Sequence, residues 1–546
     1  MFRARLGRAF RFHPATMPPP RITPTTLHIA RPLLAALFAL CAACGGGSSG
    51  GGDGGASPAP PPVSPGITDA TAYSVAPDAS LATPSEATAV THHQLALGGR
   101  TLAYTATTGH LTATQVGSGT PQASFFHVAY TLDGQAAAAL AARPVTFFFN
   151  GGPGSASMWL HLGSFAPRRL ATSMPSTALV SRFPLVDNAE TLLDISDLVF
   201  VDAVGTGQSQ AIAPATNRSC WGVDADARVF RDFIARWLVA NGRQASPRVV
   251  FGESYGTLRA AVLAEELEAA GVGVDGVVLL SSVMDYNSNC GVIDQPGAGC
   301  GGYLPSYAAT AAHFNLASPP PADVTAFVLN AMGFADQRYG PAVAAFIAGT
   351  GQPDTTLLTD LSALTGVNAT TWRNQFNLRP DTYRTALLPG QLLGRYDARI
   401  AGAVNGPLAR DGDPSLTVVN APFVTAINEL LAQQLNYRSS SGYVSFSSAI
   451  EHWQWRHDGR NLPDSIPDLA AAMLLNPRLR VLSLNGWHDL ATPFHQTVLD
   501  LRRLGPRPTV TVQHVAGGHM TYLDDASRRA QRAALGDFYR TLRTAP

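Results

Sequence analysis

Short apolar runs alternate with helical patterns through the middle of the chain. Residues 144–149, 198–202 and 274–281 are almost continuously apolar, which is typical of strands in a sheet that is buried on both faces. Residues 226–241 carry aromatic and aliphatic side chains three and four positions apart, which predicts an amphipathic helix. Strands that alternate with helices in this way predict an α/β fold built on a mostly parallel sheet.

The pattern differs on either side of this block. Three strand-like runs precede it, at 93–97, 100–106 and 124–132. Three helical patterns with Pro/Gly-rich connections follow it, at 322–332, 339–347 and 422–436. Sheet-type runs return at 479–484 and 509–515, before a closing helix at 527–543. We therefore expect an inserted, mainly helical cap at 285–476, between a first part (67–284) and a last part (477–546) of the core.

The first 44 residues have the pattern of an export signal. Six arginines and no acidic residue accompany an apolar run at 32–43 that is too short to span a bilayer and ends in small residues. Cys44 follows two alanines and resembles the lipidated cysteine of bacterial lipoproteins, although Cys41 stands where leucine is usual. Residues 45–66 are rich in Gly, Ser and Pro and predict a flexible tether. We expect an exported protein that is held at the membrane only by a lipid on Cys44. The alternative is that the signal is cleaved in the ordinary way and the protein is secreted in soluble form.

Composition and cysteine usage narrow the possible partners. Of 546 residues 46% are hydrophobic and 14% are charged, and the formal net charge is zero, so we expect no nucleic-acid surface, which needs a basic excess. Export favours disulfides, and Cys290 and Cys300 flank a loop containing Gly, Asp and Pro, so we predict a bond between them. Cys220 is expected to be a small buried side chain. The cysteine spacing does not match a zinc site and no HExxH motif is present, so no metal or cofactor is predicted. The oligomeric state is not indicated.

Residues 248–268 carry the most informative motif. An apolar run is followed by the turn Gly252-Glu-Ser-Tyr-Gly256 and by a helical pattern. A second G-x-S-x-G match, at 46–50, lies in the tether, so Ser254 alone has a strand before it and a helix after it. Glycines allow the sharp turn of a nucleophile elbow, which exposes the serine hydroxyl above a helix N-terminus. We predict that Ser254 is a nucleophile; a tight turn without chemistry is the alternative.

Two further residues have the positions that serine catalysis requires. A serine hydroxyl needs a base to take its proton, and the base needs an acidic partner. In α/β-hydrolases these follow in the order Ser, Asp, His, each on a loop after a strand. Asp489 and His519 follow the runs at 479–484 and 509–515, and we predict that they complete the triad. The competing candidates are His488, His495, His514 and Asp500, of which the last three fall within a predicted helix or strand.

An oxyanion formed during acyl transfer needs backbone N–H donors. The residue after the nucleophile, Tyr255, is one predicted donor. The loop Asn150-Gly-Gly-Pro-Gly154 ends an apolar strand, and Gly152 is the second predicted donor.

Five ordered motifs now resemble one family, peptidase family S10, the serine carboxypeptidases. They are NGGPGS (150–155), DAVGTGQS (202–209), GESYG (252–256), GWHDLATP (486–493) and GGHM (517–520). The resemblance runs from about Val145 to the C-terminus and implies an α/β-hydrolase fold that releases C-terminal residues from peptides through an acyl-enzyme. It also implies that Asn150 and Glu253 bind the carboxylate of the substrate. A glutamate donates a hydrogen bond to a carboxylate only when protonated, so activity is expected to fall as pH rises through the pKa of Glu253.

One run departs from the pattern of the plant and yeast members. They carry a further glutamate soon after NGGPG that partners the glutamate of GESYG, whereas residues 155–170 contain no acidic residue. This run also includes Arg168 and Arg169, and a cation beside Glu253 is expected to lower its pKa.

Two other functions remain open at this point. An esterase or acyltransferase would use the same triad on the same scaffold, because a fold does not fix the substrate. A catalytically silent cell-surface binding protein is the other class, and labelling of Ser254 by diisopropyl fluorophosphate would exclude it.

Overall fold

The structure is a computed structural model that describes residues 66–292 and 297–543. The predicted export signal (1–44), the tether except for its last residue (45–66) and the lipidation site Cys44 lie outside the described residues.

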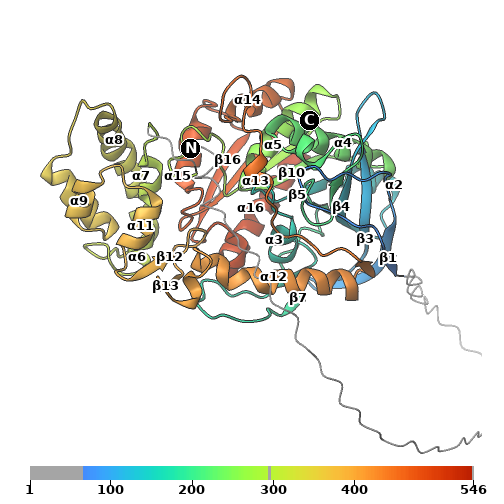
Figure 1. Cartoon of the computed structure of the whole chain (residues 1–546), viewed down its shortest axis with the longest axis horizontal. Coiled ribbons are helices and arrows are strands. Elements are labelled where there is room, and N and C mark those ends of the chain that lie inside the picture. The colour runs from blue at the N-terminus through green and yellow to red at the C-terminus, as the bar shows by residue number, and fades with distance from the viewer. Residues whose placement is uncertain (1–65, 293–296, 544–546) are drawn as a thin grey trace, which may run out of the picture. The chain divides into compact units, whose positions relative to one another are not determined.

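Ten strands form one sheet at the centre of the described residues (Figure 1). They are β2 (Thr88–Leu97), β3 (Arg100–Thr114), β4 (Pro121–Leu132), β5 (Val145–Phe149), β8 (Asp197–Val201), β9 (Gln210–Ala211), β10 (Arg248–Glu253), β11 (Gly276–Leu280), β15 (Arg480–Gly486) and β16 (Val510–Val515). Their order is β16-β15-β11-β10-β5-β8-β4-β3-β2, with β9 paired to β4. The strands from β16 to β8 run parallel and β4, β3 and β2 are antiparallel. The expected α/β fold with a mostly parallel sheet is confirmed.

Strand β5 is apolar at four of its five positions because both of its faces are covered. Phe147 contacts Trp237 of α4 (Val223–Ala240), with ring centroids 5.4 Å apart. Its neighbour Phe148 faces the opposite side and stacks on Phe251 at 4.8 Å. Side chains alternate between the two faces of a strand, so a strand with helices on both sides has no polar face.

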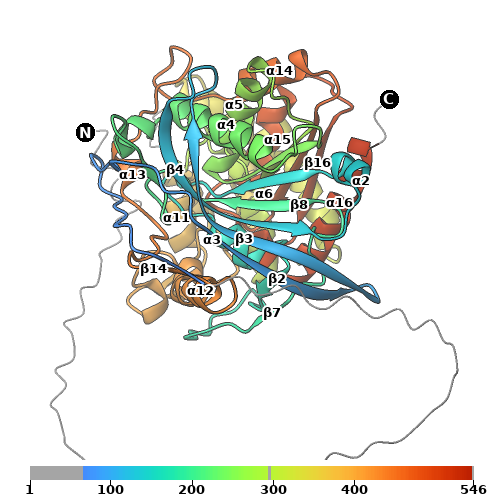
Figure 2. The ribbon, with the colours of Figure 1, turned by 90° about the vertical axis from the view of Figure 1, so that its right-hand side faces the viewer.

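Helices cover both faces of the sheet (Figure 2). Helices α4 and α5 (Tyr255–Ala269) pack on one face. On the other face α3 (Met158–Gly163), α12 (Pro414–Gln433) and α16 (Asp525–Arg543) share one apolar cluster with Phe148 and Phe251.

Within the region expected to be a cap, residues 290–401 bury a second apolar cluster, which includes Tyr307, Trp372 and Tyr383 and is joined by Leu490 of the core. Its helices lie on the left in Figure 1. They are α6 (Leu304–His313), α7 (Val324–Phe334), α8 (Gly340–Ile347), α9 (Thr355–Thr365), α10 (Ala369–Asn374) and α11 (Pro380–Ala386). Cys290 and Cys300 belong to this cluster and form the predicted disulfide, with the Sγ atoms 2.07 Å apart. A short hairpin, β12 (Gln391–Leu393) and β13 (Ala401–Ala403), follows α11.

The later part of the region packs on the main core instead. It comprises α12, β14 (Tyr437–Ser439), α13 (Ala449–His452) and α14 (Ile466–Leu475). Val419, Phe423 and Leu430 of α12 join the cluster beneath the sheet, and α14 packs against α5. Among the described helices, α12 has the length and apolar composition of a membrane span, but 56% of its apolar window is buried inside the protein.

The predicted start of α12 at residue 422 was wrong. The helix begins at Pro414, and the Asp413 carboxylate accepts hydrogen bonds from the N–H groups of Ser415 and Leu416. A proline is well suited to the first turn of a helix, where its missing N–H costs nothing. Pro414 occupies that position, and Pro422 lies inside the helix.

The first described strand, β1 (Ile67–Asp69), pairs in parallel with β14. The Asp69 carboxylate accepts hydrogen bonds from the hydroxyls of Tyr437 at 2.9 Å and Tyr73 at 2.8 Å. The N-terminal end of the described chain is therefore joined to a strand more than 350 positions away in the sequence.

Candidate active site

Ser254 lies on a strained corner between β10 and α5. Its backbone has φ +61°, in the left-handed region, which costs energy for a residue with a side chain. The turn closes tightly: a Cβ on Gly252 would lie 1.9 Å from the carbonyl oxygen of Gly256. A Cβ on Gly256 would lie 2.8 Å from the carbonyl oxygen of Phe149. Both motif glycines are thus required by the packing of an elbow, and Ser254 remains partly exposed.

The NGGPG loop lies against this elbow because β5 and β10 are neighbours in the sheet. The chain leaves β5 toward β8 on one side and continues from β10 to β11 on the other. Such a switch point opens a crevice at the carboxyl ends of the strands. A Cβ on Gly151 would lie 2.4 Å from the backbone nitrogen of Tyr255, so the two loops touch.

Tyr255 and Gly152 have the positions expected of oxyanion donors. Tyr255 is the first residue of α5, and the N–H groups of a first helical turn have no acceptor within the helix. Gly152 has φ +105°, a conformation that favours glycine. The two predicted donors therefore come from two loops in direct contact, beside Ser254.

Asp489 and His519 meet at the carboxyl ends of β15 and β16. Nδ1 of His519 lies 2.7 Å from Oδ2 of Asp489, and both side chains are buried. The other oxygen, Oδ1, accepts the N–H groups of Ala491 at 2.7 Å and Thr492 at 2.9 Å. Burial lowers the pKa of His519, but the charge and hydrogen bond of Asp489 outweigh it and the net pKa is raised. Asp489 is thus held as an acceptor that orients the imidazole.

Hydrogen bonds link this pair to the elbow. The N–H of Ser254 donates to the carbonyl of Leu280 at 3.0 Å. The next residue, Ser281, donates its hydroxyl to the carbonyl of His519 at 2.6 Å. The end of β11 therefore connects the loop of the predicted nucleophile to the loop of the predicted base.

The competing candidates have other partners. His495 contacts Asp336 at 2.8 Å. Asp500 accepts from Gln496 and Ser288, both at 2.9 Å. His514 lies within β16, as expected. His488 is buried beside Thr310, at 3.4 Å.

A short segment of the insertion, residues 394–399, contacts the loops of both Asp489 and His519, and no sequence pattern predicted this contact. The carbonyl of Arg395 accepts the N–H of Leu490 at 3.0 Å, directly after Asp489. Arg399 donates to the carbonyl of Ala516 at 2.7 Å and pairs with Asp397 at 2.7 Å. We call residues 394–399 the strap.

Glu253, Asn150 and Tyr522 form a buried polar cluster behind the nucleophile. Tyr522, from the 3-10 turn η5 (Thr521–Leu523), donates its hydroxyl to Oε2 of Glu253 at 2.8 Å. The Asn150 side-chain oxygen accepts the N–H of Leu160 at 3.1 Å, which fixes the amide. The two residues predicted to bind a carboxylate are therefore adjacent, and Tyr522 is an unpredicted third member.

Burial raises the pKa of Glu253 to about 7. The charge of His519 and hydrogen bonds from Tyr522 and Asn150 oppose this rise without cancelling it. The expectation that Arg168 and Arg169 lower this pKa was wrong. Neither arginine is among the groups that shift this pKa, and both pair with other carboxylates: Arg168 with Asp187, and Arg169 with Glu190 and Asp525.

A buried ion pair between Arg259 and Asp226 contacts the NGGPG loop through the backbone of Asn150. Nε of Arg259 lies 2.5 Å from Oδ2 of Asp226, and Nη1 donates to the carbonyl of Asn150 at 2.7 Å. The guanidinium also lies 4.6 Å from the ring centroid of Phe230. The sequence pattern around Arg259, an arginine among apolar residues of a helix, did not predict this contact with the NGGPG loop.

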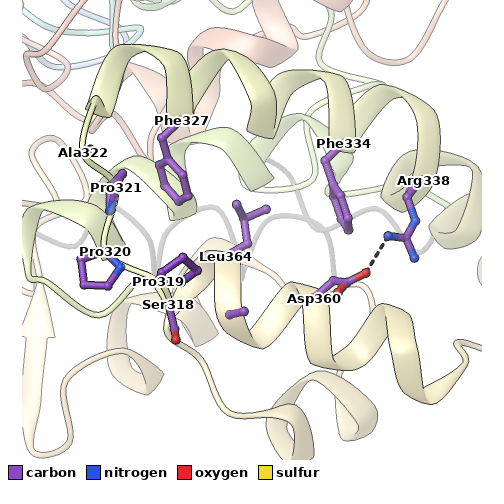
Figure 3. A pocket seen from close by; sticks show the side chains of 11 residues that line it. Ser318, Pro319, Pro320, Pro321, Ala322, Phe327, Phe334, Arg338, Asp360 and Leu364 are labelled. Carbon is purple, nitrogen blue, oxygen red and sulfur yellow. Dashed lines mark hydrogen bonds and ion pairs between the residues drawn. The ribbon is translucent and has the colours of Figure 1, made fainter.

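A separate groove of about 560 Å³ lies on the insertion between α7 and α9. Phe327 and Phe334 point into it, and Arg338 and Asp360 close one end with an ion pair of 2.6 Å (Figure 3). No predicted site residue lines this groove. In the described part of the chain, no three His, Cys, Asp or Glu side chains converge as metal ligands do.

No protein-family model matches the chain, and no curated protein matches it. Among solved structures, the chain is similar to Kex1Δp, a prohormone-processing carboxypeptidase from Saccharomyces cerevisiae. The TM-score is 0.50 and the identity 13%, over 80% of this chain and 91% of that one. Proline iminopeptidase from Mycobacterium smegmatis matches at a TM-score of 0.32 and 15% identity, over 80% and 99% of the two chains. Bromoperoxidase from Bacillus anthracis matches at a TM-score of 0.34 and 12% identity, over 79% of this chain and 100% of that one. The similarity to Kex1Δp, together with the strand order, shows that the chain has the α/β-hydrolase fold.

Proposed function

We propose that this protein is an exported serine carboxypeptidase. The observation that carries the proposal is the pairing of Glu253 with Asn150 directly beside Ser254, in a buried setting that raises the pKa of the glutamate to about 7. A protonated carboxyl and an amide N–H are two donors, and two donors are what a substrate carboxylate accepts.

The proposed reaction begins at Ser254. Its Oγ attacks the carbonyl carbon of the last peptide bond while Nε2 of His519 takes the hydroxyl proton. The N–H groups of Tyr255 and Gly152 stabilise the oxyanion. His519 then gives the proton to the leaving amine, and a water molecule activated by the same imidazole hydrolyses the acyl-enzyme.

The carboxylate subsite explains why cleavage would be limited to the terminal residue. An internal peptide bond has an amide where the terminal residue has a carboxylate, and an amide carries no charge to pair with these donors. Ionised Glu253 would repel a carboxylate. Binding of the free acid is therefore present below the pKa of Glu253 and lost as pH rises through it.

The test is kcat/KM between pH 4 and 9 on a blocked dipeptide and on its C-terminal amide. We expect the free acid to be preferred at low pH, with the preference fading near pH 7. Glu253→Gln should flatten that dependence, whereas Glu451→Gln, an exposed glutamate on α13, should not. Equal cleavage of both substrates, or turnover of simple esters only, would instead favour an esterase or acyltransferase.

Membrane attachment through Cys44 is a separate part of the proposal. It is supported by the signal-like pattern of residues 1–44. Cys44→Ser should move the protein from the membrane fraction to the soluble fraction; an unchanged distribution would favour ordinary signal cleavage or another attachment.

A further inference from the structure

Tyr522 donates its hydroxyl to Oε2 of Glu253 at 2.8 Å. We propose that Tyr522 is a positioning residue of the carboxylate subsite: its phenol occupies Oε2 of Glu253, so that the proton used to recognise a peptide's carboxylate is carried on Oε1. The inference rests on the proposed function.

The chemistry follows from the donor inventory of the two groups. A tyrosine hydroxyl has one hydrogen to donate, and a carboxyl group has two oxygens. With the phenol hydrogen directed at Oε2, that oxygen is an acceptor whether Glu253 is ionised or neutral. The added proton of the neutral form is then placed on Oε1, which leaves one defined donor instead of two alternatives.

The ring of Tyr522 is fixed on several sides. A Cβ on Gly163, the last residue of α3, would lie 2.5 Å from Cε2 of the ring, so the absence of a side chain there makes room for it. Arg528 donates to the carbonyl of Tyr522 at 3.1 Å. Thr172 donates to the carbonyl of the following residue, Leu523, at 2.8 Å. The hydroxyl is therefore aimed by a rigid turn.

Other groups also act on the proton state of Glu253. His519 favours the ionised form, Asp489 disfavours it, and hydrogen bonds from Asn150 and Tyr522 favour it. Tyr396 of the strap lies within electrostatic range of Glu253 as well. Of these, Tyr522 alone donates an O–H to Oε2 and can be changed without altering a charge, the amide or the triad.

The experiment compares wild type with Tyr522→Phe, which keeps the ring. The control is Tyr539→Phe, which removes another buried hydroxyl, at 2.5 Å from Thr146. At pH 5 the ratio of kcat/KM for the free acid to that for the amide should fall about tenfold in Tyr522→Phe. The pH at which the preference is lost should rise, because the carboxylate has lost a donor. The kcat/KM for the amide should not change, and Tyr539→Phe should leave ratio and midpoint unaltered.

A second readout does not depend on activity. The infrared C=O band of protonated Glu253, identified by its loss in Glu253→Gln, is titrated in wild type and Tyr522→Phe. A higher midpoint and a shifted band in Tyr522→Phe support the inference.

The outcomes separate the two proposals. If wild type prefers the free acid but Tyr522→Phe changes neither the ratio nor the Glu253 band, the inference is overturned and the proposed function stands. If wild type shows no preference, the proposed function fails, and a band shift in Tyr522→Phe still supports the coupling of Tyr522 to Glu253. Equal losses on acid and amide would also overturn the inference, since they indicate damage to the triad.

Discussion

The backbone carbonyl of Tyr396 accepts a hydrogen bond from the N–H of His519 at 2.5 Å. Tyr396 belongs to the strap, which lies within the insertion. His519 follows β16, the last strand of the core sheet in the sequence. The predicted general base is thus held by a segment more than 120 positions earlier in the sequence. Rigid support of this kind is what keeps a catalytic group in its productive orientation.

Contact between the strap and the histidine loop predicts that Gly518 tolerates no side chain. A Cβ there would lie 2.4 Å from the carbonyl oxygen of Tyr396 and 2.6 Å from Cβ of Asp397. Gly518→Ala should therefore displace His519 and lower kcat by about 10²-fold, the effect of a misplacement near 1 Å. Steady-state kinetics measure this, with Gly442→Ala as control, because nothing lies within 4 Å of a Cβ at that position. Equal kinetics for the two variants would contradict the role of the strap.

Replacement of Asp489 by asparagine should remove catalysis and keep the fold. An amide retains the shape but no longer fixes the imidazole tautomer or stabilises the imidazolium. We expect kcat to fall by about 10⁴-fold, while fluorophosphonate labelling of Ser254 becomes slow. Circular dichroism should show an unchanged spectrum. Retention of most activity would show that another acid, such as Asp500, serves His519.

The two substrates should have different pH profiles. His519 must be neutral to accept a proton, so activity on the amide rises through the pKa of His519, which is raised, and then stays level. The free acid also needs protonated Glu253, so its kcat/KM should fall again as pH rises through about 7. Because the two groups interact, the limbs belong to the pair and not to either residue alone. Identical profiles for acid and amide would exclude a role for Glu253 in binding.

The buried pair of Arg259 and Asp226 should make a large contribution to stability. Arg259→Met leaves an unpaired buried carboxylate, and loss of one partner of a buried pair costs about 3–5 kcal/mol. The variant should also lose activity, since Arg259 holds the carbonyl of Asn150. Urea unfolding gives the free energy, with Arg338→Ala as control. Its ion pair with Asp360 is exposed and should contribute at most about 1 kcal/mol.

The sequence was most informative where local geometry determines the position of a residue. Ser254, Asp489 and His519 each follow an apolar strand, and a parallel sheet brings the carboxyl ends of its strands to one edge. Their approach could therefore be predicted without any knowledge of the insertion. Glycine positions such as Gly252 and Gly256 are equally local, because the tight turn itself excludes a side chain.

Contacts between distant segments could not be predicted. Tyr522 meets Glu253 across 269 positions, and no periodicity in either segment specifies the meeting. Arg168 and Arg169 are close to NGGPG in sequence, yet they pair with Asp187 and Glu190. Proximity in sequence was a poor guide there because both arginines lie on a short strand, β6 (Arg168–Leu170), whose antiparallel partner β7 (Leu185–Asp187) carries Asp187.

The pairing of β1 with β14 has a mechanical consequence. Both strands run in the same direction, so tension applied to the chain before Ile67 loads their hydrogen bonds together in shear and not one after another. The bonds from Tyr437 and Tyr73 to Asp69 lie at the inner end of this joint. A pull from the N-terminal side is therefore borne first by β14 and by the helix α12 before it.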